Sequence, residues 1–235
     1  MEIDYAQLEF RIAVDLCDDK QGRQDITDKR DVHAFTASTL FDDFEGADKA
    51  TKKKLRTKAK AYTFRPLFGG SYGTDREQDY YAAFKRRYDG ITSTQQDWIH
   101  EVSGSDNLSL VLASGLRLYY PDCRFNARSG KYGSETKIKN APIQSFASAE
   151  VTLLAVGMLW HWLRENSMQS FILATVHDSV ILEVHPDEVE AITKASTEIM
   201  TEGVVDLLYK LYNYRLTVPL EVEHEHGYHW SEVLG

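Results

Sequence analysis

The sequence predicts an α+β fold in which helices are inserted between antiparallel strands. Residues 171–184 hold two apolar, β-branched runs separated by a two-residue turn, and this pattern is typical of a β-hairpin. Segments with helical periodicity, among them residues 50–67 and 147–164, lie between this hairpin and a short strand at the start of the chain. The apolar content of 43% and the charged content of 27% are those of a globular protein with an ordinary core.

The first part of the chain is expected to pass from a strand directly into helices. Residues 2–5 are expected to end a strand, and residues 7–16 to form a helix with one apolar face. Asp18–Gly22 has the composition of a loop. A further helix is expected from Asp31 to about Thr39.

A longer helix is expected over residues 50–67. It should kink or end at Arg65-Pro66, because the residue before a proline is disfavoured in the α region. Residues 75–88 and 93–102 are expected to form two more helices, with a break that contains Gly90.

The rest of the chain is expected to alternate between strands and helices. The expected elements are strands at 116–120 and 136–139 flanking a turn at 129–133, a helix at 147–164, the hairpin of 171–176 and 179–184, a helix from 186 to about 212, and a strand at 216–223.

Composition excludes several classes of protein. The longest apolar run, Val151–Trp162, is interrupted and short of a membrane span, and the first residues do not form a secretory signal. We therefore expect a cytoplasmic protein with no membrane partner. Cys17 and Cys123 match no zinc-ligand spacing, so we expect reduced, unpaired thiols.

Charge is distributed unevenly along the chain. The net charge of -9 does not favour nucleic-acid binding, which depends on lysine and arginine. Between Lys49 and Lys60, however, there are seven basic residues and no acidic one. A solvated helix face is the simpler interpretation of such a run, and a phosphate-binding surface is the alternative.

Two aspartates stand at positions suited to metal binding. Asp178 lies at the tip of the expected hairpin, between two apolar strands, and Asp4 lies at the end of the first strand. Carboxylates held by rigid strand ends could bind a pair of Mg²⁺ ions about 4 Å apart. A turn aspartate without a function is common, so this pattern alone leaves both interpretations open.

The expected helix at 50–67 carries a second candidate site. Arg56, Lys60, Phe64 and Phe68 follow one another in steps of four, so they are expected to lie along one helix face. The cations suit a triphosphate and the rings suit a base. An amphipathic helix with surface cations and core rings would give the same spacing.

Together these segments resemble the sequence motifs of the family A DNA polymerases, which include bacterial DNA polymerase I and its phage relatives. The matches to motifs A, B and C are Asp4–Arg11, then Arg56, Lys60, Phe64 and Gly69, then Val176–Asp178. Three further matches, which fill the gaps in the expected order, are Asp31–His33, Asn140–Gln144, and Pro219–Glu223 followed by Trp230.

This resemblance implies a polymerase palm with an antiparallel sheet and an inserted helical fingers subdomain. The palm would comprise residues 1–28 and 118–235, and the fingers residues 29–117. The implied reaction is two-metal nucleotidyl transfer from a dNTP to the 3′-hydroxyl of a primer. Primer-template DNA, dNTPs and two Mg²⁺ ions are the implied partners and cofactors.

The resemblance also implies a role for each site residue. Asp4, Asp178 and the backbone carbonyl of Tyr5 would bind the metals, and Lys60 would act in catalysis as well as in binding. The residues implied to hold the dNTP are Arg56, Lys60, His33, Phe64, Phe68, Gln7 and Glu9, with Glu9 excluding the 2′-hydroxyl of a ribonucleotide. The residues implied to contact DNA are Gln144, Asn140 and His177.

Some features depart from the family pattern. Phe68 stands where tyrosine is usual, and Ser179 stands where glutamate is usual, as in single-subunit RNA polymerases. The thumb and the first palm segment have no counterpart here, so we expect a split polymerase whose second chain supplies them. An RNA-making or RNA-copying polymerase and a non-catalytic remnant that binds nucleic acid or a replisome partner are the alternatives.

Overall fold

The computed structural model describes residues 1–70 and 72–229, so the family match at Trp230 lies outside the described residues. The chain forms two compact units. One, here called the sheet unit, comprises Met1–Ile12, Val111–Leu116 and Gln144–Gly235. The other, here called the helical unit, comprises Ala13–Leu110 and Arg117–Ile143. The palm and fingers ranges expected from the sequence remain predictions.

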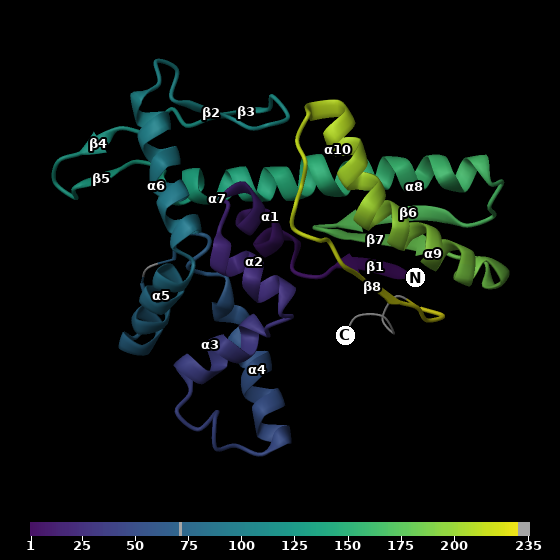
Figure 1. Ribbon diagram of the computed structural model, residues 1–235, viewed down its shortest axis with the longest axis horizontal. Coiled ribbons are helices and arrows are strands. Elements are labelled where there is room, and N and C mark those ends of the chain that lie inside the picture. The colour runs from purple at the N-terminus through teal and green to yellow at the C-terminus, as the bar shows by residue number, and fades with distance from the viewer. Residues whose placement is uncertain (71, 230–235) are drawn as a thin grey trace. The chain divides into compact units, whose positions relative to one another are not determined.

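The sheet unit is built on a four-stranded sheet with the order β6-β7-β1-β8 (Figure 1). Its strands are β1 (Glu2–Tyr5), β6 (Phe171–Val176), β7 (Ser179–Glu183) and β8 (Val222–Glu225). All three strand pairs are antiparallel. The expected hairpin and the expected first strand are confirmed. β1 pairs with β7 on one side and β8 on the other, and its Ile3 is fully buried.

The helices of the sheet unit contain two π-helical turns. The first, η1 (Phe146–Thr152), joins α7 (Glu135–Ser145) to α8 (Leu153–Glu165). The second, η3 (Ile199–Gly203), joins α9 (Val189–Glu198) to α10 (Val204–Tyr212), and the short η2 (Pro186–Glu188) precedes α9. Both long helices expected from the sequence are therefore present. The π turns were not predictable, because the one extra residue in each turn changes the spacing of apolar residues too little to be recognised in the sequence.

The continuous helix Glu135–Glu165 is the one helix in the described part of the chain that is long and apolar enough to cross a membrane by length and composition. Of its most apolar window, 44% is buried inside the protein. The core helix of a soluble protein meets the same criterion, so this helix is weak evidence for a membrane span.

The helical unit contains most of the remaining elements. Its helices are the end of α1 (Leu8–Leu16), α2 (Lys20–Thr27), α3 (Val32–Leu40), α4 (Lys49–Thr63), α5 (Asp75–Arg87) and α6 (Asp89–Gly104). Short strands follow: β2 (Ser109–Val111), β3 (Arg117–Tyr119), β4 (Phe125–Asn126) and β5 (Lys131–Tyr132). Both cysteines are free and buried in this unit.

The loop expected at Asp18–Gly22 is wrong, because α2 begins at Lys20. The carboxylate of Asp19 accepts a hydrogen bond of 2.7 Å from the backbone N–H of Gly22 and so caps the helix. Gly22 fits inside the helix because α1 packs closely there: a Cβ at this position would lie 2.4 Å from Cγ2 of Val14. The glycine that suggested a turn instead permits close helix packing.

Two further expectations need correction. The strand expected at 136–139 is wrong, because these residues lie in α7, where Ile138 is fully buried in the core. Burial of an apolar helix face overrides the strand preference of β-branched residues. The final strand lies at β8, several residues after the start of the expected strand at 216–223.

Candidate active site

The sheet places Asp4, on β1, next to the strand that follows the hairpin turn of Asp178. Asp4 lies opposite Ser179 in the register of β1 and β7, and Asp178 directly precedes β7 in the hairpin turn. The pKa of Asp4 is raised to about 6, first by burial and then by the negative charges of Asp178, Glu2 and Glu223. The two carboxylates predicted to bind metal are therefore close enough to repel each other.

The turn that carries Asp178 and the turn that follows the strand of Asp4 have unusual backbone geometry. His177, the first residue of the hairpin turn, has a φ of 56°, and Gln7, between β1 and α1, also has a φ of 56°. A positive φ is uncommon outside glycine and is often retained at functional sites. Burial raises the pKa of Asp178, while its own backbone N–H and the charge of His177 oppose this rise.

The donor set of this pair suits a divalent cation. Oxygen ligands are those that Mg²⁺ prefers, and a protein site commonly supplies one or two carboxylates while substrate phosphates and water complete the shell. A cation would also relieve the repulsion that raises the pKa of Asp4. Among the described residues no group of three or more histidine, cysteine, aspartate or glutamate side chains could hold a metal. The pair therefore fits Mg²⁺ only with ligands from a substrate or solvent.

Glu9 lies beside the same aspartates. Burial raises the pKa of its carboxyl group, a hydrogen bond from the side chain of Gln144 lowers it, and the charges of Asp178 and His177 act in opposite directions. The sheet unit thus brings together five of the predicted residues: Asp4, Asp178, Glu9, Gln144 and His177.

The side chains of Arg11 and Tyr5, to which the motif assignment gave no role, also lie at this site. Arg11 donates hydrogen bonds to the carbonyls of Ala6, at 2.8 Å, and of Pro219, and its guanidinium pairs with Glu221 at 2.9 Å. It therefore fixes the segment between β1 and α1 to the chain that leads into β8. The buried hydroxyl of Tyr5 has no hydrogen-bond partner among the described residues, and both burial and the charge of Asp178 raise its pKa.

The helical unit brings the predicted phosphate-binding residues together. Arg56 and Lys60 lie on α4, and His33 lies in the first turn of α3. Burial lowers the pKa of His33, and the positive charges of Arg56 and Lys60 lower it further, against the opposing charge of Asp31. Three basic side chains from two helices therefore share one region.

A buried chain of hydroxyl groups supports His33. Its Nδ1 lies 2.9 Å from Oγ1 of Thr63, which also lies 2.9 Å from Oγ1 of Thr36. The hydroxyl of Tyr80 lies 3.0 Å from Thr36 and donates to the carbonyl of Thr63 at 2.8 Å. This network fixes the imidazole in place, and no sequence motif pointed to it.

The helix-face prediction is wrong for the two rings. Because α4 ends at Thr63, Phe64 is the residue that caps the helix, and Phe68 lies beyond Pro66 in a series of turns. Proline at position 66 explains this early end, since the residue before it disfavours helical geometry. Phe64 still reaches the basic cluster: its ring contacts the ring of His33 edge-on, with centroids 5.6 Å apart.

The two predicted DNA-contacting residues of α7 belong to different units. Gln144 lies in the sheet unit beside Glu9, whereas Asn140 lies in the helical unit. Oδ1 of Asn140 is buried and has no hydrogen-bond partner among the described residues.

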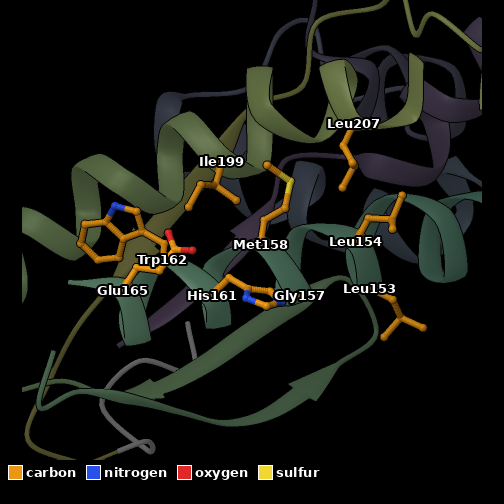
Figure 2. Close-up of a pocket in the computed structure, with 9 residues that line it drawn as sticks. All are labelled: Leu153, Leu154, Gly157, Met158, His161, Trp162, Glu165, Ile199 and Leu207. Carbon is orange, nitrogen blue, oxygen red and sulfur yellow. The ribbon is translucent and has the colours of Figure 1, made fainter. Parts of the chain in front are cut away.

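An apolar groove of about 490 Å³ lies between α8 and the helices η3 and α10. Figure 2 shows Met158 of α8 pointing toward the helix that carries Ile199 and Leu207. None of the residues that line it is a predicted site residue, so the groove is separate from the candidate chemistry.

The DNA polymerase family A model matches residues 1–232. The chain is 30% identical over 236 residues to the thermostable DNA polymerase I of Thermus aquaticus, covering 97% of this chain and 26% of that protein. It is 28% identical over 245 residues to DNA polymerase I of Geobacillus stearothermophilus, covering 97% of this chain and 25% of that protein.

A solved structure shares the fold. The POL domain of Pol1 from M. smegmatis, in complex with DNA primer-template and dNTP, superposes with a TM-score of 0.79 at 24% identity, covering 100% of this chain and 40% of that one. This match confirms the expected mixture of helices and antiparallel sheet. The chain spans about a quarter of the curated relatives named above. From the family match over nearly its whole length, the chain belongs to DNA polymerase family A.

Proposed function

We propose that this chain is the catalytic part of a template-directed DNA polymerase, which transfers a nucleotide from a dNTP to the 3′-hydroxyl of a primer with two Mg²⁺ ions. The observation that carries the proposal is the pair of neighbouring carboxylates on β1 and the β6–β7 turn, in a chain of this family. The expected residue ranges of the palm (1–28 and 118–235) and fingers (29–117) form part of the proposal.

Each group of residues has a defined task in this reaction. Asp4, Asp178 and the carbonyl of Tyr5 would hold the metal ions, which when bound supply charge that activates the attacking oxygen and stabilises the leaving one. In the helical unit, Arg56 and Lys60 neutralise the triphosphate. His33, whose pKa is lowered by burial and neighbouring cations, stays uncharged at neutral pH and donates a hydrogen bond.

The remaining site residues would position the substrates. Phe64, held against His33, stacks on the incoming base, and Phe68 lies nearby in the sequence. His177 contacts the primer terminus, and Gln144 and Asn140 face the minor groove of the new base pair. Gln7 supports the nucleotide site from its left-handed turn.

Glu9 is proposed to exclude ribonucleotides by occupying the space of the 2′-hydroxyl. Glu9→Ala is expected to raise the use of NTPs relative to dNTPs by about 10²-fold, the usual scale for admitting a hydroxyl. Primer extension with each nucleotide set measures this ratio. Glu225→Ala, which removes a carboxylate from β8 in the same unit, should leave the ratio unchanged. A wild-type protein that prefers NTPs would instead favour the RNA-polymerase alternative.

We further propose that a second polymerase chain supplies the thumb and the remaining palm strands. β6 is an end strand of the described sheet, and its Phe171 and Leu173 are 50% and 55% exposed. Exposed apolar edge strands are normally covered by another segment. A net charge of -9 also leaves little grip on duplex DNA without additional basic polypeptide.

This partner is testable through the edge strand. Leu173→Lys is expected to weaken association with a candidate partner chain by at least about fivefold, as for a residue at the centre of an interface. Leu211→Lys on α10, where the side chain is 54% exposed, is the matched control. If both variants bind the partner chain with the same affinity, β6 is not the contact surface.

The whole proposal is tested by primer extension with and without candidate partner chains. Mg²⁺-dependent extension from dNTPs is the expected result, and we propose that the chain acts in the cytoplasm of a bacterium or a phage-infected host. Extension by the chain alone, processive over many nucleotides, would show that no second chain is needed. Nucleic-acid binding without extension in any combination would support the non-catalytic alternative.

A further inference from the structure

The side chain of Asp31 contacts both parts of the basic cluster. Its Oδ1 accepts hydrogen bonds from the backbone N–H groups of His33 and Ala34, each at 3.0 Å, and so caps α3. Its Oδ2 accepts a hydrogen bond from Nε of Arg56 on α4. One carboxylate therefore joins the helix that carries His33 to the arginine proposed to bind triphosphate.

The geometry of the arginine contact leaves its outer edge open. Among the described residues, Arg56 uses only Nε in a hydrogen bond, and neither Nη group has a partner. The two Nη groups form the edge of the guanidinium that grips phosphate oxygens in a bidentate manner. The side chains of Arg56 and Asp31 are 38% and 39% exposed, so an anion can reach this edge from solvent.

Asp31 remains charged at neutral pH. Burial acts to raise its pKa, but the hydrogen bond and charge of Arg56 and the backbone N–H groups of Ala34 and His33 outweigh this and lower it. Without the carboxylate, the side chain of Arg56 would sample more rotamers and would lose that freedom when it binds a phosphate.

We propose that Asp31 is a positioning residue that orders Arg56 and His33 with respect to each other before the triphosphate arrives. This inference rests on the proposed role of Arg56 in binding triphosphate. The opposing effect is repulsion between Asp31 and the phosphates. The carboxylate contacts Nε and leaves the Nη edge of Arg56 open to phosphate. The ordering of Arg56 therefore outweighs the repulsion between Asp31 and the phosphates, so removing the charge of Asp31 weakens triphosphate binding.

Isothermal titration with dATP and with inorganic tripolyphosphate, both in EDTA, tests this proposal on the whole chain. Asp31→Asn keeps a good helix cap, since asparagine and aspartate are about equal at that position. It is expected to raise the Kd of both ligands by about five- to tenfold, the size of one charge-assisted hydrogen bond. Asp42→Asn, which removes the ion pair with Arg76 elsewhere in the helical unit, should leave both Kd values unchanged.

The double variant Arg56→Ala/Asp31→Asn separates positioning from a general loss of structure. If Asp31 acts through Arg56, Asp31→Asn causes no further weakening once the guanidinium is gone. Weakening of equal size in both backgrounds would overturn the proposal, as would unchanged or tighter binding by Asp31→Asn alone. Should Arg56→Ala itself leave both Kd values unchanged, the proposed function of Arg56 fails, and the role of Asp31 fails with it.

A kinetic readout accompanies the binding data. In primer extension by the complete polymerase, Asp31→Asn is expected to raise the KM for dNTP by a similar factor with little change in kcat, because the ordering is needed for binding. A fall in kcat at constant KM would contradict this role.

Discussion

Replacing Asp4 or Asp178 with asparagine is expected to lower the rate of nucleotidyl transfer by at least about 10³-fold, since metal ions contribute several kcal/mol to stabilising such a transition state. Asparagine keeps the shape of the side chain but removes the charge that holds the cation. Single-turnover primer extension with saturating dNTP measures the effect. The non-catalytic alternative predicts that the wild type does not extend the primer, and that both variants bind nucleic acid as the wild type does.

The control for this prediction is the thermal stability of the variant, which shows whether a loss of activity comes from unfolding. The folded-state pKa of Asp4, about 6, is above the ordinary value, so the folded protein loses stability as pH rises through this value. In EDTA, Asp4→Asn should therefore raise the melting temperature at pH 8 and change it little at pH 4. Glu225→Gln, on the neighbouring strand β8, should retain activity. Loss of activity with gain of stability would identify Asp4 as a residue retained for chemistry.

Lys60→Ala is expected to lower the rate of transfer by about 10²-fold, the scale on which removing one preorganised donor acts. Lys60 lies one turn after Arg56 on α4 and contributes to the positive field at His33. Its charge stabilises the negative charge that develops on the leaving phosphates. Rapid-quench measurements at saturating dNTP report this loss in kcat.

The matched control for Lys60 is Lys58→Ala. Lys58 is exposed on the same helix but points in another direction, two residues from both Arg56 and Lys60. It should retain the wild-type rate. Equal losses for the two variants would mean that α4 acts only through its overall positive charge.

The sheet and its carboxylates were predictable from local signals. The hairpin has two β-branched runs around a two-residue turn, and this pattern needs no distant contact to be recognised. The spacing of four between Arg56 and Lys60 likewise predicts that both lie on one face of α4, as they do.

Other features depended on distant contacts that the sequence does not show. Gly22 lies in a helix because Val14 approaches it, and residues 136–139 are helical because Ile138 enters the core. The Thr63 hydroxyl beneath His33 and the Asp31 bond to Arg56 join residues 25 to 30 positions apart. Such pairings follow from the packing of α3 on α4, which no periodicity reveals.

The central claim, that the carboxylates of Asp4 and Asp178 lie side by side, is tested most directly by the pKa of Asp4 in metal-free protein. Carboxyl ¹³C NMR titration of the wild type should give a value of about 6. In Asp178→Asn this pKa should fall partway toward the ordinary value of about 3.9, because burial still raises it. An Asp4 pKa that is unchanged by this substitution would contradict the account.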